Sequence, residues 1–138
     1  MDFLYQDPYP ILKDDTQYKK LTSDYVKVEQ LGDREILVVD PKGLELLAQE
    51  AMDDVSFMLR SAHLQKLRNI IEDPEATDND RFVAYNLLQN AAVAVEGQLP
   101  SCQDTGTAIV VAKKGENVYT GVDDGEWLSK GIYNTYQN

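Results

Sequence analysis

Apolar and polar side chains alternate in the stretch that follows the first two dozen residues. Every second side chain is apolar in residues 25–29, a Leu-Gly-Asp turn follows at residues 31–33, and residues 34–39 are rich in β-branched side chains. An alternating segment and a β-branched segment that are joined by a short turn with glycine are typical of a β-hairpin. The pattern therefore predicts an antiparallel hairpin over residues 25–39.

A period of about 3.6 residues replaces this alternation after the hairpin. Asp40 and Pro41 form a start signal, because aspartate suits the N-cap of a helix and proline suits its first turn. Seven apolar side chains then fall on one face, which predicts a helix from about Pro41 to Arg60. These side chains are Leu44, Leu47, Ala48, Ala51, Val55, Met58 and Leu59.

Three more helices are predicted further along the chain. One has apolar residues at helical spacing and ends before Pro74. Another begins near Thr77 and ends by Gly97, since glycine commonly follows the last helical turn. The last opens at the acidic pair of residues 123 and 124, which the helix dipole favours near an N-terminus.

The valine-rich run at residues 107–112 predicts a buried strand. Lys113, Lys114 and Gly115 would form a solvated turn that leads into a second hairpin strand at residues 118–120. With the first hairpin and the helices, this predicts an α+β fold, which is mainly helical and has short antiparallel β-hairpins.

We expect residues 1–138 to form one N-terminal domain of a longer protein. A chain of this length suits a single domain that buries roughly two-thirds of its unfolded surface. Residues 1–24 are rich in Tyr, Pro and Asp without a period, which predicts an extended arm. The last predicted helix carries Trp127, Ile132 and two tyrosines near residue 138, so we expect further chain to pack on it.

The charge and composition of the chain narrow its possible partners. The formal net charge is −11, which disfavours nucleic acid and anionic membranes because both would be repelled. No apolar run approaches the ~20 residues that a membrane span needs, and the first residues lack the features of a secretory signal. A single cysteine excludes an internal disulfide and fits a reducing compartment. These features predict a soluble, cytoplasmic protein.

That cysteine lies in a loop of sequence LPSCQDTGT, between a predicted helix and a predicted strand. The residues alone leave three roles open for Cys102. It can be a small buried apolar residue, a nucleophile with His63 as the one candidate histidine base, or a metal or iron–sulfur ligand. We assign His63 no site role, because a lone histidine at a helix junction is more often a structural hydrogen-bonding group.

Several motifs together resemble the class I, iron–sulfur-dependent fumarate hydratases. The strongest match is LPSCQDTGTAIVVAKKG, with GIYNTY further on. The resemblance also includes KDDTQY, LTSDYV, SFMLRSAH and EDPEATDNDRFVAYNLL, so it covers nearly the whole chain. CQDTG alone is less specific, since the related tartrate dehydratases carry a similar motif.

The resemblance implies an enzyme that reversibly hydrates fumarate to (S)-malate. Family members hold a [4Fe–4S] cluster by three cysteines, which leaves one iron open, and this implies that Cys102 is one of the three ligands. It also implies that Gln103 and Asp104 line the pocket for the dicarboxylate substrate. The other cysteines, a base and the substrate-binding arginines would lie outside this chain, so we expect the chain alone to be inactive. Family members are usually homodimers.

The resemblance also implies how the pocket residues act. Gln103 would donate hydrogen bonds to a substrate carboxylate, and Asp104 would contact the hydroxyl and transfer its proton. The plain alternative for Asp104 is to accept backbone N–H bonds within its own loop. Two other functions stay open: a tartrate dehydratase-like hydro-lyase, and a non-catalytic acidic interaction domain in which Cys102 is buried.

Overall fold

The computed structural model of the chain describes residues 3–7, 10, 17–101 and 107–137. Helices predominate over strands in these ranges, so the predicted α+β class is confirmed. In chain order the elements are β1 (Val26–Leu31), β2 (Arg34–Val39), α1 (Pro41–Phe57), α2 (Ser61–Glu72), α3 (Asp78–Ala94), β3 (Val118–Tyr119) and α4 (Asp124–Gln137).

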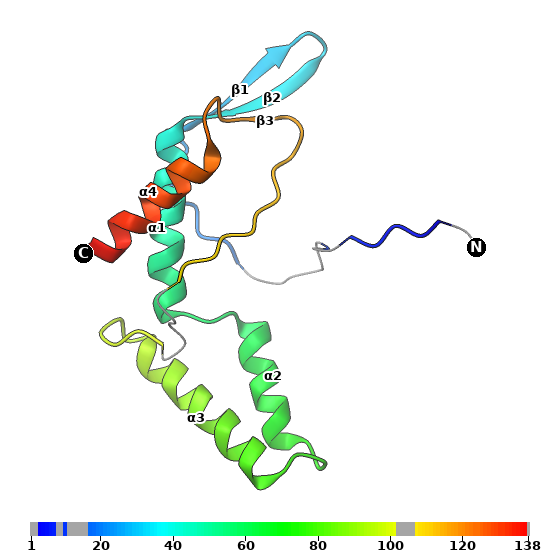
Figure 1. Ribbon diagram of the computed structural model, residues 1–138, viewed down its shortest axis with the longest axis vertical. Helices are drawn as coiled ribbons and strands as arrows, with labels where there is room; N and C mark the ends of the chain where they lie inside the picture. Colours follow the sequence, from blue (N-terminus) through cyan, green and yellow to red (C-terminus); the bar gives the residue numbers. More distant parts are fainter. Residues whose placement is uncertain (1–2, 8–9, 11–16, 102–106, 138) are drawn as a thin grey trace.

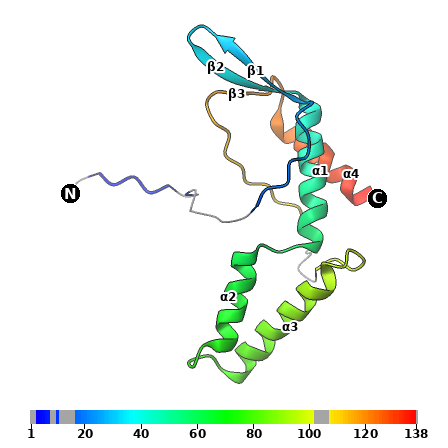
Figure 2. The same ribbon diagram turned by 180° about the vertical axis from the view of Figure 1, so that it is seen from behind.

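Helix α1 connects the two ends of the structure (Figure 1). The small sheet lies at its N-terminal end, the α2–α3 pair lies at its C-terminal end, and α4 packs across it. The reverse view shows the N-terminal arm extending sideways from this body (Figure 2). None of the described helices combines the length and the apolar character that crossing a membrane requires.

The first predicted hairpin is confirmed. Strands β1 and β2 pair antiparallel, from Val26 opposite Val39 to Leu31 opposite Arg34. Gly32 has a φ of +64° and is the first of the two turn residues. A type II′ turn needs a positive φ at that position, which glycine adopts without steric cost.

The predicted second hairpin is wrong. Strand β3 is two residues long and pairs parallel to β2, with Leu37 opposite Val118. Residues 107–112 form no strand, although their side chains favour one, and the side chain of Ile109 is 80% exposed. The physical reason is that a strand requires a neighbour, and no backbone hydrogen bond joins this segment to another part of the described chain.

Local capping chemistry sets the helix starts as predicted. The Asp40 carboxylate accepts a hydrogen bond from the backbone N–H of Lys42 at 2.9 Å, directly at the start of α1. Thr77 forms a reciprocal capping box with the third residue of α3. The end of α1 differs from the prediction, because the chain becomes extended at Met58 (φ −124°, ψ 134°), before Arg60.

The described chain has little core of its own. Only Ala48, Leu67, Ala84 and Ala94 are buried apolar residues among the described ones. The accessible surface is 11337 Å², whereas a compact monomer of this mass exposes about 7,200 Å². The chain therefore buries only about half of its unfolded surface instead of the expected two-thirds. The described part of the arm has no helix or strand and is exposed except at Leu21 and Thr22, which are half-buried, and Phe3 is 91% exposed.

Candidate functional site

The three predicted site residues, Cys102, Gln103 and Asp104, lie outside the described residues. The structure does describe the residues on both sides of them, Ser101 and Thr107. The site is therefore built from the surroundings of these two flanking residues.

Ser101 is held against the C-terminal end of α1. Its backbone N–H donates a hydrogen bond to the carbonyl oxygen of Ser56 at 2.7 Å, and Ser101 is only 8% exposed. The last carbonyls of a helix have no partner within the helix, so this bond satisfies one of them. Ser56 itself donates from its hydroxyl to the Met52 carbonyl at 2.7 Å. The residue directly before Cys102 thus has a defined position at the end of α1.

Both flanking residues line a groove of about 720 Å³, which we call the α1–α4 groove. Its walls come from the C-terminal half of α1, the chain on either side of the loop, and the end of α4. Apolar walls with a few polar groups are typical of small-molecule sites. The lining residues are Met52, Asp53, Val55, Ser56, Phe57, Leu59, Gly97, Pro100, Ser101, Thr107, Ala108, Ile109, Thr135 and Tyr136.

The charge of the α1–α4 groove does not suit a dicarboxylate by itself. Asp53 is the one charged side chain among its described lining residues, and its carboxylate repels an anion. The hydroxyls of Ser56, Thr107 and Thr135 are neutral polar groups in the same lining. A dicarboxylate would therefore need cationic groups from another part of the protein.

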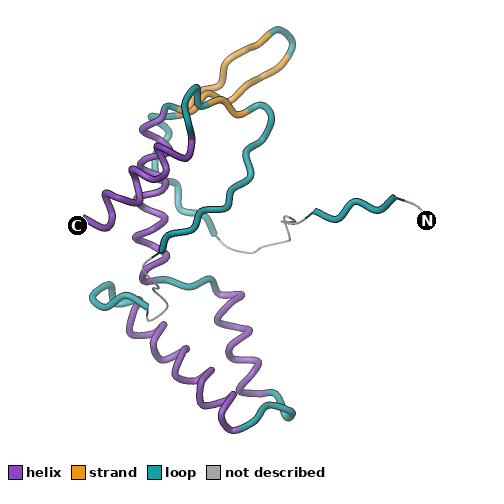
Figure 3. The backbone as a smooth tube through the Cα atoms, in the orientation of Figure 1, coloured by secondary structure: helices purple, strands orange, loops and turns teal. Residues whose placement is uncertain are grey.

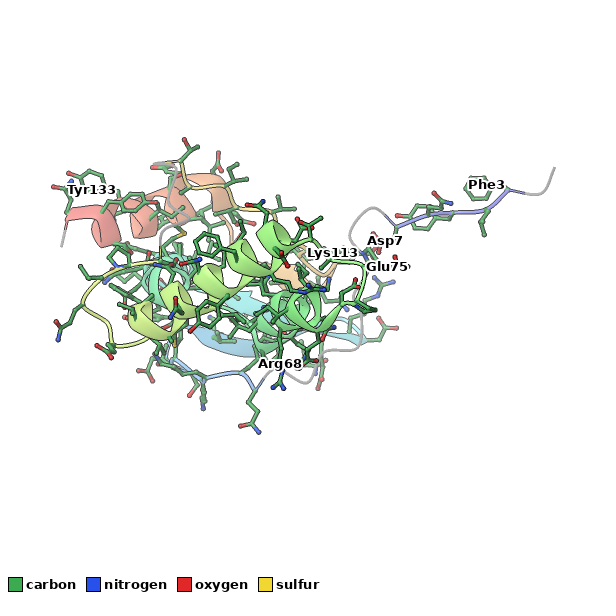
Figure 4. All side chains as sticks on the ribbon, turned by 90° about the horizontal axis from the view of Figure 1, so that it is seen from below. Phe3, Asp7, Arg68, Glu75, Lys113 and Tyr133 are labelled. Carbon is green, nitrogen blue, oxygen red and sulfur yellow. The ribbon has the colours of Figure 1, made fainter. Side chains whose placement is uncertain are left out.

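The two lysines predicted to form a solvated turn are engaged in ion pairs away from the groove lining. Lys113 pairs with Asp7 of the arm at 2.5 Å. Figure 4 labels both residues, which lie near one another. Lys114 pairs with Asp124 at the start of α4, and the Thr120 hydroxyl donates to the same carboxylate. The hydrogen bond from Lys114 holds the pKa of Asp124 below its usual range, and the bond from Thr120 adds to this effect. These lysines therefore connect segments of the fold.

Helix α4 reaches the groove because it packs very closely on α1. Gly131 is buried at the crossing, and a Cβ atom placed there would lie 2.2 Å from the Glu45 carbonyl oxygen. Four residues later, the Thr135 hydroxyl donates to the Gln49 carbonyl at 2.9 Å. These contacts bring Thr135 and Tyr136 to the rim of the groove.

A polar cluster on one side of the crossing fixes α4 further. Asn134 donates to one carboxylate oxygen of Glu45 at 2.8 Å, and Lys130 approaches the other at 3.2 Å. Lys130 also lies over the Trp127 ring, 4.6 Å from its centre. Sequence reasoning missed Ser56, Gly131 and this cluster, although the spacing of small residues in GIYNT was a signal for close helix packing.

The Glu45 cluster predicts that stability depends on pH. The hydrogen bond from Lys130, with a smaller contribution from Asn134, lowers the pKa of Glu45 from about 4.5. A carboxyl whose pKa is lowered in the folded state adds stability at pH values above its ordinary, unfolded-state pKa. This stability is lost as the pH falls through the lower, folded-state pKa. We expect the denaturant concentration at the midpoint of unfolding to decrease as the pH is lowered from about 5 to about 3. This decrease should be smaller in Glu45→Gln.

The matched control for this measurement is Glu126→Gln, an exposed glutamate on α4, the helix that carries the partners of Glu45. It should retain the pH dependence of the unchanged protein. If the unfolding midpoint depends on pH equally in Glu45→Gln and in the unchanged protein, the assigned role of the cluster is contradicted.

The described residues contain no group of three or more His, Cys, Asp or Glu side chains that could hold a metal ion. The whole chain has one cysteine, whereas [4Fe–4S] clusters are held by several thiolates. The donor set of this chain therefore offers one thiolate ligand and does not fit a complete cluster.

A family model described as Fumarate hydratase (Fumerase) matches residues 45–138, which is more than half of the chain. The chain belongs to this fumarate hydratase family. The matched region includes α1 from residue 45 onward, both ends of the loop at Cys102 and all of α4, so it includes every wall of the α1–α4 groove.

Curated relatives confirm the resemblance to the class I enzymes. The anaerobic class I fumarate hydratase of Escherichia coli (strain K12) is 55% identical over 134 residues, which cover 97% of this chain and 24% of the relative. The aerobic class I enzyme of the same strain is 53% identical over the same shares. The mitochondrial fumarate hydratase 1 of Leishmania major is 50% identical over 125 residues, which cover 89% of this chain and 23% of the relative. The chain thus spans about a quarter of the length of these relatives.

Proposed function

We propose that this chain is the N-terminal quarter of a class I fumarate hydratase, which adds water to fumarate to give (S)-malate. The observation that carries the proposal is the identity of 55% with such an enzyme along 97% of the chain. The anchored position of Ser101 at the rim of a groove supports it, because the chain continues from there into Cys102.

We propose that Cys102 is one ligand of the iron–sulfur cluster. The chain supplies one thiolate, so the remaining ligands belong to the rest of the polypeptide. The same proposal includes a homodimeric enzyme in a reducing, cytoplasmic location, which the single cysteine and the class I resemblance support.

Gln103 and Asp104 are proposed to act on the substrate directly. The Gln103 amide would donate hydrogen bonds that orient one substrate carboxylate. The Asp104 carboxylate would accept the proton of the water oxygen as that oxygen bonds to carbon, and return it in the reverse reaction. A donor from the rest of the polypeptide would protonate the neighbouring carbon.

The lining of the groove supports a substrate site to which this chain and the rest of the polypeptide contribute different groups. Its described lining has hydroxyls and apolar walls but no lysine or arginine. The positive groups that grip both carboxylates would therefore come from beyond this chain. This agrees with the small share of the relatives that the chain covers.

The first test compares the 138-residue chain with the full polypeptide, by which we mean this chain together with whatever its gene encodes after residue 138. We expect the full polypeptide, purified without oxygen, to hydrate fumarate and the 138-residue chain to show no activity. Loss of fumarate absorbance and formation of malate measure the reaction.

Substrate choice is tested in the same assay with tartrate. We expect turnover of fumarate and malate well above that of tartrate. Hydration of fumarate by the 138-residue chain alone would contradict the proposal that the rest of the polypeptide supplies essential groups. A preference for tartrate would contradict the proposed substrate. A full polypeptide inactive on both would favour a non-catalytic interaction domain.

A further inference from the structure

Residues 107–112, which we call the TAIVVA segment, form no strand in the described chain (Figure 3). The segment runs from the loop after α3 toward β3; it starts beside the C-terminal part of α1 and then moves away from that helix (Figures 1 and 2). Three of its six residues are β-branched aliphatic residues, and these favour a pleated sheet over any other regular structure.

The TAIVVA segment is apolar, but most of its side chains are exposed to water. Ile109 is 80% exposed, Val110 is 48% exposed and Val111 is 63% exposed. Within the described residues, no backbone N–H or carbonyl of the segment has a backbone partner. An apolar extended chain with free backbone groups is a template for pairing with another strand.

We propose that the TAIVVA segment is an inner strand of a sheet whose other strands come from the full polypeptide beyond residue 138. This inference rests on the proposed function, because it takes the missing strands from the remaining three-quarters of a class I enzyme. The docking surface is thus the extended backbone and both side-chain faces of the segment.

The run of apolar side chains indicates which partner pairs with the segment: strands from beyond residue 138, or the same segment of a second copy of the chain. Side chains on successive residues point to opposite faces of a strand, and Ala108, Ile109, Val110 and Val111 are all apolar. A strand with two apolar faces belongs inside a sheet that is covered on both sides. Pairing with an identical segment would cover one edge of the strand and leave both faces in water.

The exposed area supports the same choice. The chain exposes about 4,000 Å² more than a compact monomer of its mass. A standard interface between two proteins covers about 800 Å² on each partner. The relatives contain roughly three times as much further chain as this one supplies, and a body of that size can cover such an area.

Charged groups mark where the proposed strand stops. Lys113 follows directly and pairs with Asp7, and Lys114 pairs with Asp124. Both pairs hold the chain outside the apolar run and leave the segment itself free to enter a sheet. Docking would fix Thr107 on one side of the loop, as the Ser101–Ser56 hydrogen bond fixes the other side.

Hydrogen exchange of the full polypeptide tests the proposal. We expect the amides of residues 108–112 to exchange roughly 1,000-fold more slowly than those of residues 113–116. In the 138-residue chain the two sets should exchange at similar rates. Fast exchange of residues 108–112 in the full polypeptide would overturn the inference, and so would a native polypeptide that ends at residue 138.

A charge substitution gives a second readout. Ile109→Lys should lower the thermal midpoint of the full polypeptide by about 5 to 10 °C, because it buries a charge in the sheet. The control Asn117→Lys adds the same charge at an exposed position and should change the midpoint by about 1 °C or less. If Ile109→Lys gives no soluble protein, the exchange measurement on the unchanged polypeptide decides. Equal midpoints for the two variants would overturn the inference.

These readouts separate the strand proposal from the proposed function. Hydration of fumarate with unprotected amides at residues 108–112 would overturn the strand and leave the function standing. Protected amides at residues 108–112 in a polypeptide that does not hydrate fumarate would support the strand and contradict the proposed function. Protection in the 138-residue chain that rises with its concentration would show that a second copy is the occupant, and would overturn our choice.

Discussion

Cys102→Ala is expected to reduce fumarate hydration by the full polypeptide roughly 1,000-fold or more. A thiolate that holds a catalytic cluster cannot be replaced by a methyl group, and a metal centre contributes several kcal/mol to such a reaction. The variant should also lose iron and inorganic sulfide together with activity. Rates and metal content are both measured on protein that is purified without oxygen.

The two readouts separate the three roles that the residues leave open for Cys102. A buried apolar cysteine predicts nearly full activity and a modest loss of stability. A nucleophile predicts lost activity with unchanged iron. A cluster ligand predicts that both are lost. The control is Ser129→Ala, which removes a small polar atom from an exposed position on α4 and should change neither readout. Unchanged iron in Cys102→Ala would contradict the proposed ligand role.

The sequence predicted those parts of the fold that depend on neighbouring residues. The N-cap at Asp40 occurs as expected, and the helix expected to begin near Thr77 does begin there, with Thr77 as its N-cap. Both caps act on backbone groups two or three residues away. The hairpin with Gly32 is equally local, because its turn geometry sets the pairing of both strands. Each of these features could be recognised without knowing what packs on it.

The features that were not predicted depend on distant contacts. The parallel pairing of β3 with β2 joins residues about eighty positions apart. The side chains of residues 107–112 favour a strand, but the described chain has no strand there, because a strand forms only where a partner strand is present. The end of α1 came earlier than its apolar period suggests, because the chain leaves the helix at Met58 and Leu59 becomes part of the groove.

The candidate site shows the same contrast. The motif around Cys102 indicates chemistry through the residue types that it contains, and the structure adds a fixed Ser101 beside it. The groove wall from α4 could not be predicted, since it depends on how closely two helices 80 residues apart can approach. That approach depends on Gly131, which periodicity treats as a neutral position.

Gly131→Ala is expected to destabilise the full polypeptide by about 2 kcal/mol. The added Cβ would lie 2.2 Å from the Glu45 carbonyl oxygen, 2.8 Å from the Ala48 Cβ and 3.0 Å from the Gln49 nitrogen. Two of these atoms belong to the backbone of α1, so no side-chain rotation relieves the overlap and the helices must separate. The helix propensity of alanine offsets this by at most about 1 kcal/mol. Denaturant unfolding, followed by the signal of Trp127 in α4, measures the change.

Separation of the helices would reach the groove as well as the stability. Thr135 and Tyr136 lie on the same helix within five residues of Gly131, and Thr135 donates to the Gln49 carbonyl across the crossing. We therefore expect fumarate hydration to fall together with stability in Gly131→Ala. The matched control is Gly115→Ala, whose Cβ would meet nothing closer than a Val118 methyl at 3.7 Å and should be tolerated in both measurements. Equal stability of the two variants would show that α4 does not cross α1 at Gly131, and the α1–α4 groove would then lose one of its walls.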